Sequence, residues 1–352
     1  MPIDESLITE EVLNNTLARE VFPEIKTISN QKMGKVRTVY DVGEELVMMA
    51  SDNLSTHDRV HRRQVYGKGD NLNAISAYYF QQTGHIITNH LIRNLAPNTW
   101  LVRRAQPILV EMVFRRYITG SAWKSYVEHK GQEQGMEFCG ISLRPGYKEN
   151  EKLDELIFTP TAKGQVKDFS IPEFHGLDQE KDDPAITIDM IKRNYKSFGL
   201  RRPEDIDFLI EIGFNLYSFI HHDLESKGQL LADTKWEFGY LPDGTIILID
   251  ECVTPDSSRF WSAAYYIFDP KNNRFKIKQG DKQPFRDYIE GLGLHLDKDK
   301  IPEHWMDSKV LREGVVRYCD MRETITGTQA EITTVPRREV ILEALASGGY
   351  LI

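Results

Sequence analysis

The sequence predicts a mixed α/β protein of the α+β type, in which antiparallel sheets are flanked by helices. Within residues 230–250, two β-prone runs flank a Pro-Asp-Gly turn, which is a strong hairpin signal. A long amphipathic helix is predicted just before this hairpin, from Pro203 to Gly228, which stops it. The 352 residues can bury a substantial core, and this length suggests about two domains.

The composition is that of an ordinary globular protein and argues against several classes of function. A net charge of −9 disfavours nonspecific binding of nucleic acid, although it is compatible with a local basic pocket for an anionic metabolite. No apolar run approaches the ~18 residues of a membrane span, and the first residues lack a secretory pattern. Cys139, Cys252 and Cys319 form no Cys-x-x-Cys pair, which predicts free thiols in a reducing compartment, the cytoplasm.

The first strand predicted in the chain carries two cations, and it follows a helix that begins after Thr9. Gly34 opens the strand, Lys35 and Arg37 share one of its faces, and residues 46–50 form an apolar return strand. A glycine lets a ligand approach the backbone closely, and the cations could meet phosphates. An exposed edge strand with surface cations accounts for the same pattern, and the spacing is not that of a Walker A loop.

Polar residues 51–58, ending in Asp58, follow the return strand. This pattern is typical of a site loop and equally of an ordinary capping turn. A helix is then predicted with Asp70 as its N-cap and Gly84 at its end.

A hinge between two lobes could lie between the strands predicted at residues 101–104 and 108–114. The second strand leads to Arg115 and then to Ser121 near a helix start, which suits a phosphate cradle or a simple serine N-cap. A short stretch that changes from apolar to polar residues ends in Lys163. Residues 164–184 are predicted to form a long loop, and a helix is expected from Thr187.

One face of the 230–250 hairpin gathers charge, because alternate residues of a strand share a face. Asp233, Lys235 and Glu237 project together. Pairing Tyr240 with Thr245 would place Asp250 opposite Lys235, and a tighter turn would place it opposite Glu237. The register between these two would move Asp250 to the other face.

Two carboxylates at such a separation can hold a hydrated Mg²⁺, with a lysine nearby for phosphate oxygens. The alternative is a solvated charged face. The opposite face, expected to be buried, carries Thr234, Trp236, Phe238, Ile247 and Ile249. The hairpin runs into residues 254–259, Thr-Pro-Asp-Ser-Ser-Arg, which are rich in phosphate-binding groups. Further helices are predicted at 281–291 and 315–325.

Taken together, these stretches resemble the SAICAR synthetase family of purine biosynthesis. The run Leu-Ala-Asp-Thr-Lys-x-Glu-Phe-Gly, followed by Asp-Glu-x-x-Thr-Pro-Asp-Ser-Ser-Arg, is highly specific. The segments that carry the resemblance appear in the family's order at residues 34–41, 51–58, 67–69, 111–124, 158–163, 230–239 and 249–261.

The resemblance implies a two-lobed enzyme related to ATP-grasp proteins and protein kinases in its ATP-binding half. Residues 1–105 would form an ATP-binding lobe, 106–295 a substrate- and metal-binding lobe, and 296–352 a helical extension packed on the core. The implied reaction joins CAIR (carboxyaminoimidazole ribonucleotide) to L-aspartate through an acyl phosphate, with ATP and Mg²⁺. The implied partners are these small molecules, with no nucleic acid or membrane, and the protein would be a monomer or a homodimer.

The resemblance implies a role for each residue that matches a functional position of the family. The implied ATP contacts are Gly34, Lys35 and Arg37, with residues 103–107 as the adenine-side hinge. The implied ligands of the nucleotide metal are Glu237 and Asp250. The implied substrate contacts are Asp58, Arg115, Ser121, Lys163, Asp183, Lys235 and Arg259, and the catalytic set is Asp58, Lys235, Glu237 and Asp250.

The chain departs from the family's pattern at His57, where phenylalanine is usual, and at Arg116, where glycine is common. Both departures lie near the expected CAIR site. The main rival activity is a small-molecule kinase on the same scaffold, which would leave the phosphate on its product. A nucleotide-binding regulatory protein is disfavoured because Lys35, Glu237 and Asp250 are all present.

Overall fold

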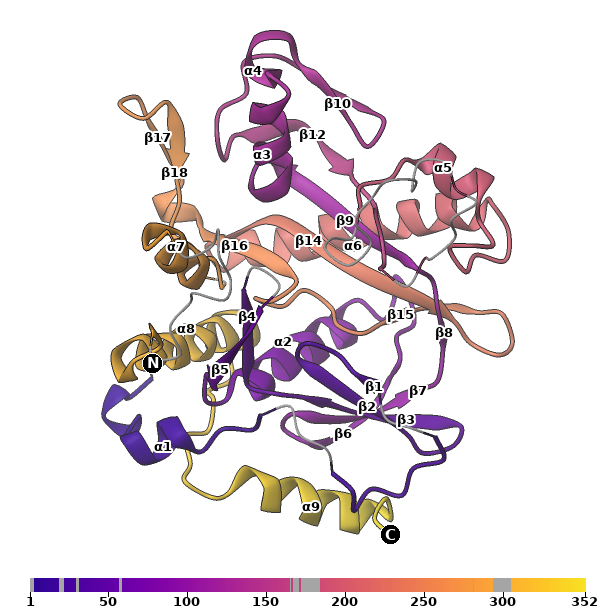
Figure 1. The fold of residues 1–352 in the computed structure, drawn as a ribbon, viewed down its shortest axis with the longest axis vertical. Coiled ribbons are helices and arrows are strands. Elements are labelled where there is room, and N and C mark those ends of the chain that lie inside the picture. The colour runs from indigo at the N-terminus through magenta and orange to yellow at the C-terminus, as the bar shows by residue number, and fades with distance from the viewer. Residues whose placement is uncertain are drawn as a thin grey trace.

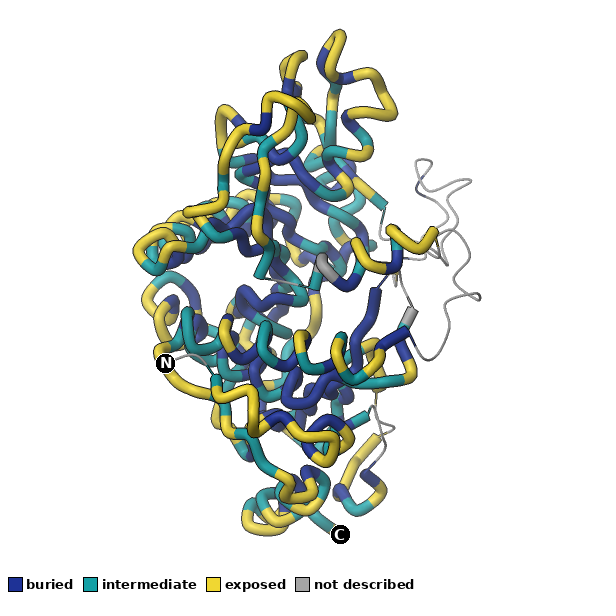
Figure 2. The backbone as a smooth tube through the Cα atoms, turned by 90° about the vertical axis from the view of Figure 1, so that its left-hand side faces the viewer, coloured by how far each residue is buried: buried dark blue, intermediate teal, exposed yellow. Residues whose placement is uncertain are grey.

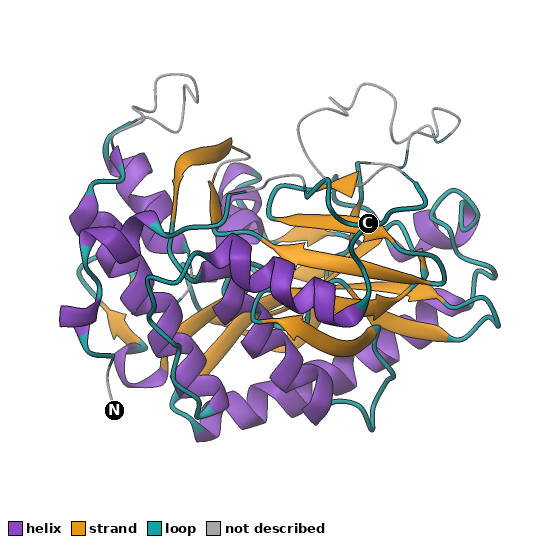
Figure 3. Ribbon diagram, turned by 90° about the horizontal axis from the view of Figure 1, so that it is seen from below, coloured by secondary structure: helices purple, strands orange, loops and turns teal. Residues whose placement is uncertain are grey.

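The computed structural model describes most of the chain, namely residues 3–18, 22–29, 32–56, 59–164, 166, 171, 184–280, 282–293 and 305–352. It confirms the mixed fold class, with antiparallel sheets and helices that pack against them (Figure 1). The helices lie largely outside the layer of strands (Figure 3). No helix within the described ranges is both long enough and apolar enough to cross a bilayer.

The smaller sheet is antiparallel and has the order β1-β2-β3-β7-β6. Its strands are β1 (Lys32–Met33), β2 (Arg37–Asp41), β3 (Glu45–Ala50), β6 (Leu91–Ala96) and β7 (Thr99–Arg103). The β2–β3 hairpin confirms the predicted strand and its apolar return. A separate hairpin of β4 (Asn53–Thr56) and β5 (Arg59–Gln64) follows, and helix α2 (Lys68–Gln82) packs near β3.

The larger sheet is built around the twelve-residue strand β14 (Gln229–Tyr240). β9 (Val110–Tyr117) pairs with one edge of β14, while β16 (Ser258–Ser262), β15 (Ile246–Ile249) and β8 (Gln106–Pro107) pair elsewhere along its length. β12 (Lys152–Phe158) and β13 (Thr161–Ala162) extend the sheet beyond β9. Segments far apart in sequence therefore meet on a single strand.

The remaining elements surround the two sheets. Small hairpins are formed by β10 (Met136–Phe138) with β11 (Ile141–Leu143) and by β17 (Ile267–Asp269) with β18 (Arg274–Lys276). The helices beyond α2 are α1 (Glu10–Asn14), α3 (Gly120–Glu128), α4 (Gly131–Gln134), α5 (Ile188–Arg193), α6 (Asp205–Ser226), α7 (Gln283–Gly291), α8 (Ser308–Thr326) and α9 (Arg337–Gly348), with short 3₁₀ turns η1 (Glu5–Leu7) and η3 (Ala263–Tyr265).

Local sequence chemistry explains most helix boundaries. The helix starts predicted after Thr9 and near Thr187 are confirmed, and the side chains of both threonines cap α1 and α5 by accepting backbone N–H groups. The prediction of Asp70 as an N-cap is wrong. α2 begins after Gly67, whose φ of +69° suits glycine, and Asp70 lies in the first turn.

The main hydrophobic core lies under the larger sheet. Trp236 and Phe238, on the buried face of β14, pack with Phe114 of β9 and with the apolar side of α6. Gly213 of α6 is needed there, because a Cβ atom would lie 2.0 Å from the Phe114 ring. Buried segments run through the middle of the molecule, with exposed ones at its periphery (Figure 2).

The C-terminal helices pack on the smaller sheet's side of the molecule, where α8 lies against α2 (Figure 1). From α9, the buried Arg337 reaches Asp52 at 2.6 Å and also pairs with Asp70. Asp52 is fully buried and accepts the backbone N–H groups of Leu17 and Gly69, each at 2.9 Å. Burial raises the pKa of Asp70 to about 6. Arg337 thus neutralises carboxylates that would otherwise be buried alone.

We predict that Arg337→Met lowers the free energy of unfolding by about 3–5 kcal/mol, because it leaves buried carboxylates without their cation. The loss should be larger at pH 8 than at pH 5. A raised folded-state pKa means that the folded protein takes up the proton as pH falls through about 6, which relieves the unpaired charge. Urea unfolding at both pH values measures the loss.

The matched control is Arg338→Met, because Arg338 pairs with Glu24 at 2.8 Å and both side chains are about one-third or more exposed. Such a surface pair should contribute little to stability at either pH. Equal losses in the two variants would contradict the role assigned to Arg337.

Candidate functional site

One face of β14 gathers the charged residues of the site. Antiparallel pairing sets Asp233 opposite Arg115 of β9, and the alternation of the strand carries Lys235 and Glu237 along the same side. The Lys235 Nζ lies 3.8 Å from a Glu237 carboxylate oxygen, as the predicted shared face requires. Trp236 and Phe238 point the opposite way into the core, so the scaffold of this face is rigid.

Asp250 reaches the same site by a route that the sequence analysis missed. The hairpin pairs Tyr240 with Ile246 and Glu237 with Ile249, which is the register between the two predicted ones. Both predicted registers are therefore wrong, as is the placement of Ile247 and Ile249 on the face opposite Glu237. A continuing strand would send Asp250 to the core side, but β15 ends at Ile249 and Asp250 turns with a φ of +64°.

Glu237 and Asp250 influence each other electrostatically. Burial and the Asp250 charge raise the pKa of Glu237, which also forms an ion pair with Lys163. Burial acts in the same direction on Asp250, but Arg37 and Lys235 outweigh it and lower the pKa of Asp250. Both carboxylates therefore lie among cations, with Lys163 and Lys235 beside Glu237 and Arg37 beside Asp250.

The donor set fits a magnesium ion that is bound together with phosphates. Mg²⁺ commonly takes one or two protein carboxylates and completes its octahedron with water and substrate phosphates. Among the described residues no group of three or more His, Cys, Asp or Glu side chains could hold a metal. Two carboxylates, as supplied by Glu237 and Asp250, are the number of protein ligands that such a nucleotide-bound cation commonly takes.

Glu111 is a site residue that the sequence analysis did not single out. Its carboxylate pairs with Lys235 and accepts a hydrogen bond from the Thr161 hydroxyl at 3.1 Å. Burial alone would lower the pKa of Lys235, but Glu111 and Glu237 raise it well above the usual lysine range. The signal was an acid four residues before Arg115 in an apolar strand, which places both on one face.

Arg37 connects the smaller sheet to the end of the hairpin. Its guanidinium donates to the backbone carbonyl of Asp250 at 2.9 Å and pairs with Glu251 at 3.0 Å. Glu251 was not identified from sequence either. Lys35 lies in the connection between β1 and β2, so the prediction of Lys35 and Arg37 on one strand face is wrong. Gly34 shapes this connection by donating its N–H to the Arg37 carbonyl at 2.7 Å.

A second cluster lies further along β14 and forms an anion cradle. Arg115 and Arg259 both pair with Asp233, at 2.7 and 2.5 Å, and Arg115 also donates to the Ser121 hydroxyl at 3.2 Å. Gly120, with a φ of +56°, allows the Arg259 guanidinium to approach the start of α3 closely. Two guanidinium groups against one carboxylate leave a positive excess, which suits a phosphate.

Ser121 contributes to this cradle without capping its helix. The N-cap of α3 is Thr119, and no side chain completes the cap there. Ser121 and Arg259 also line a large cavity of about 1380 Å³ between α3, the β17–β18 hairpin and α7. The predicted phosphate cradle at this helix start is therefore open to a ligand.

The other predicted site residues are distributed as follows. Lys163 lies at Glu237, on the metal side, rather than in the anion cradle. Arg116 donates to the Asp154 carbonyl at 3.4 Å, because neighbouring residues of a strand face opposite ways. The side chain of Arg116, which stands where the family commonly has glycine, therefore lies outside the anion cradle. Asp58, Asp183 and His57 lie outside the described residues.

Comparisons with known proteins identify the family to which the chain belongs. A family model described as SAICAR synthetase matches residues 30–303. The phosphoribosylaminoimidazole-succinocarboxamide synthase of Saccharophagus degradans is 33% identical over 90% of this chain and 93% of its own length. The synthase of Desulforapulum autotrophicum is 35% identical over 87% and 96%, respectively.

Solved structures show the same fold. The SAICAR synthase of Saccharomyces cerevisiae, solved with SAICAR, superposes with a TM-score of 0.69 at 27% identity and covers 89% of this chain and 99% of its own. A SAICAR synthetase solved with ADP has a TM-score of 0.59 at 24% identity, covering 86% and 100%. By the extent of the family match and by its curated relatives, the chain belongs to the SAICAR synthetase family.

Proposed function

We propose that this chain makes SAICAR from CAIR, L-aspartate and ATP, and that β14 carries both halves of the site. The observation that supports this proposal is the order of charges along one face of the strand. Glu237 and Lys235 lie beside Asp250 and Arg37, and Asp233 follows within the Arg115–Arg259 cradle. A nucleotide end and a phosphate end are thus joined by one rigid element.

At the nucleotide end, Gly34, Lys35 and Arg37 would contact ATP, and Glu237 and Asp250 would hold its Mg²⁺. The metal would neutralise phosphate charge during transfer. Lys235, kept protonated by Glu111, would face the transferring phosphoryl group. Lys163 would be released from Glu237 to meet the phosphate or the substrate carboxylate when the metal binds.

At the substrate end, Arg115, Ser121 and Arg259 would hold the CAIR phosphate. Asp233 would keep the two guanidinium groups aimed at it. Asp58 would orient the CAIR carboxylate, and Asp183 would provide a further substrate contact. The relative from Saccharomyces cerevisiae was solved with SAICAR, which supports a ribonucleotide as the ligand of this chain.

The chemistry that fits this site proceeds by an acyl phosphate. A CAIR carboxylate oxygen attacks the γ-phosphorus of ATP, the bond to ADP breaks, and the carboxylate gains a leaving group. The aspartate amine then attacks the acyl carbon, and the C–O bond breaks to release phosphate while the amide forms. The contribution of this chain is positioning and charge neutralisation. Family membership favours this ligation over the kinase alternative.

Further parts of the proposal concern organisation. We divide the chain into an ATP-binding lobe at residues 1–105, a substrate- and metal-binding lobe at 106–295, and an extension at 296–352. The two sheets and the packing of α8 on α2 support this division. The described thiols of Cys139, Cys252 and Cys319 suit a reducing compartment, so we propose that the protein acts in the cytoplasm. We further propose that it acts as a monomer or a homodimer.

Glu237→Gln should lower the turnover number by two orders of magnitude or more and raise the Mg²⁺ concentration needed for half-maximal rate, because a carboxylate ligand is lost. Steady-state assays over a Mg²⁺ series measure both effects. The control is Glu225→Gln on the surface of α6, which should keep wild-type kinetics. Normal Mg²⁺ dependence in Glu237→Gln would remove this residue from the ligand set.

Arg259→Ala should raise the KM for CAIR by tenfold or more and change the KM for ATP less than twofold, since a charge-assisted contact is worth about 1.5–3 kcal/mol. Arg144→Ala is the control, because Arg144 also pairs with carboxylates, those of Glu151 and Asp154, but at an exposed position away from the anion cradle. If both KM values rose equally in Arg259→Ala, the assignment to the CAIR phosphate would fail.

An isotope experiment tests the acyl phosphate. CAIR labelled with ¹⁸O in its carboxylate should pass one labelled oxygen into the released phosphate for each SAICAR formed, because that oxygen leaves with the phosphoryl group. Mass spectrometry of the phosphate measures the transfer, and unlabelled CAIR in ¹⁸O-water is the control for exchange. Unlabelled phosphate from labelled CAIR would exclude this route.

A further inference from the structure

A buried ion pair connects three separate segments next to the site. The ammonium of Lys68, at the start of α2, lies 2.7 Å from Asp256, and Lys68 is completely buried. The hydroxyl of Tyr318, on α8, donates to the other oxygen of Asp256 at 3.0 Å. Lys68 also lies 5.6 Å from the centre of the Tyr318 ring. Asp256 is therefore held by a cation and a hydroxyl from two different helices.

The charge on Asp256 is permanent at physiological pH. Burial alone would raise the pKa of this carboxyl group, but Lys282 and Lys68 hold it well below its usual range. Burial in turn lowers the pKa of Lys282 to about 8. A carboxylate that stays ionised and is bound on both oxygens is suited to fixing a loop.

The loop that carries Asp256 connects the two ends of the proposed site. On one side, the Thr254 hydroxyl donates to Glu251 at 2.7 Å, and Glu251 pairs with Arg37. On the other side, Ser258 and Arg259 begin β16, where Arg259 enters the anion cradle. The Asp256 N–H also bonds to the Thr254 hydroxyl at 3.2 Å. A displacement of Asp256 would thus shift Arg259, which is three residues away along the chain.

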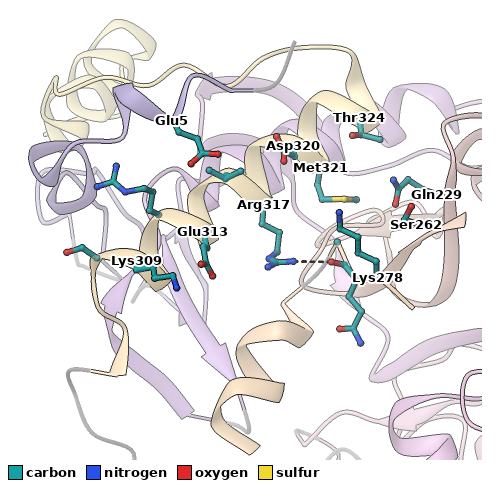
Figure 4. Close-up of a pocket in the computed structure, with 15 residues that line it drawn as sticks. Glu5, Gln229, Ser262, Lys278, Lys309, Glu313, Arg317, Asp320, Met321 and Thr324 are labelled. Atoms are coloured by element: carbon teal, nitrogen blue, oxygen red, sulfur yellow. Dashed lines mark hydrogen bonds between the residues drawn. The ribbon is translucent and has the colours of Figure 1, made fainter. Parts of the chain in front are cut away.

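Contacts on two sides of helix α8 hold the helix, and with it Tyr318, in place. Its neighbour Arg317 donates to the backbone carbonyl of Gln279 at 3.0 Å, which ties the helix to the segment before α7 (Figure 4). A cavity of about 710 Å³ lies along this side of α8, where Arg317 and Lys278 both line it (Figure 4). The opposite side of α8 packs Leu311, Val315 and Tyr318 into the core it shares with Leu72 of α2.

We propose that Tyr318 is a positioning residue for the ligation. Through Asp256 it fixes the 254–259 loop, so that Arg259 presents its guanidinium to the CAIR phosphate. The inference rests on the role proposed for Arg259 and extends it to a helix beyond residue 303, where the family match ends. No contact between Tyr318 and a substrate is required.

Tyr318→Phe tests this proposal, because it removes the hydroxyl and keeps the ring beside the Lys68 ammonium. The KM for CAIR should rise about fivefold, which corresponds to the loss of one hydrogen bond, and the KM for ATP should stay within twofold. Calorimetric titration with CAIR in the absence of ATP should show the same loss of affinity. Urea unfolding of the same variant reports its stability.

Tyr79→Phe is a closely matched control. The Tyr79 hydroxyl also donates to a carboxylate at 3.0 Å, that of Asp223, which also pairs with a lysine, Lys227, at 2.6 Å. This triad joins α2 to α6 and does not contact the 254–259 loop. Tyr79→Phe should lose comparable stability with an unchanged KM for CAIR.

The outcomes separate the inference from the proposed function. An unchanged KM for CAIR in Tyr318→Phe, or an equal rise in Tyr79→Phe, would overturn the positioning role while Arg259→Ala still weakened CAIR binding. If Arg259→Ala left CAIR binding intact, the proposed phosphate cradle and the positioning role would both fall. A selective rise in Tyr318→Phe would support the inference.

Discussion

The structure depends on one constraint, which is that β14 carries charges at alternate positions while its other face is buried. A buried charge is tolerated only with a partner of opposite sign, because removal from water costs several kcal/mol per ion. Asp233, Lys235 and Glu237 each meet that condition through residues from other elements. Their partners are Arg115 and Arg259, Glu111, and Lys163, respectively. The neighbouring strands must therefore be placed so that these pairs form.

The same pairs describe a site that is prepared for charged ligands. In the proposed function, a phosphate entering between Arg115 and Arg259 would compete with Asp233 for guanidinium groups that already converge. A metal ion held by Glu237 would take the place of the Lys163 ammonium as its counter-charge. Ligand binding would then exchange one set of ion pairs for another, and little energy would be spent on organising the protein.

Much of this arrangement could be predicted because it follows from local periodicity. The hairpin of β14 and β15, the α6 helix before it and the threonine caps of α1 and α5 are each set by residues close in sequence. The shared face of Lys235 and Glu237 follows from strand alternation alone. Errors arose where the backbone leaves a regular path, as at Lys35 in a connection and at Asp250 with its positive φ.

The remaining features join residues that are distant in sequence, and no local pattern encodes such pairs. Glu111 and Lys235 are 124 residues apart, Lys68 and Asp256 are 188 apart, and Arg337 and Asp52 are 285 apart. Each pair is at least partly buried in the fold, although in the sequence each residue alone looks like an ordinary surface charge. The incorrect hairpin register before Asp250 also shows why the sequence was not enough. A register shift of one residue reverses a strand's faces, and only the left-handed turn after Ile249, with Arg37 beside it, returns the carboxylate to Glu237.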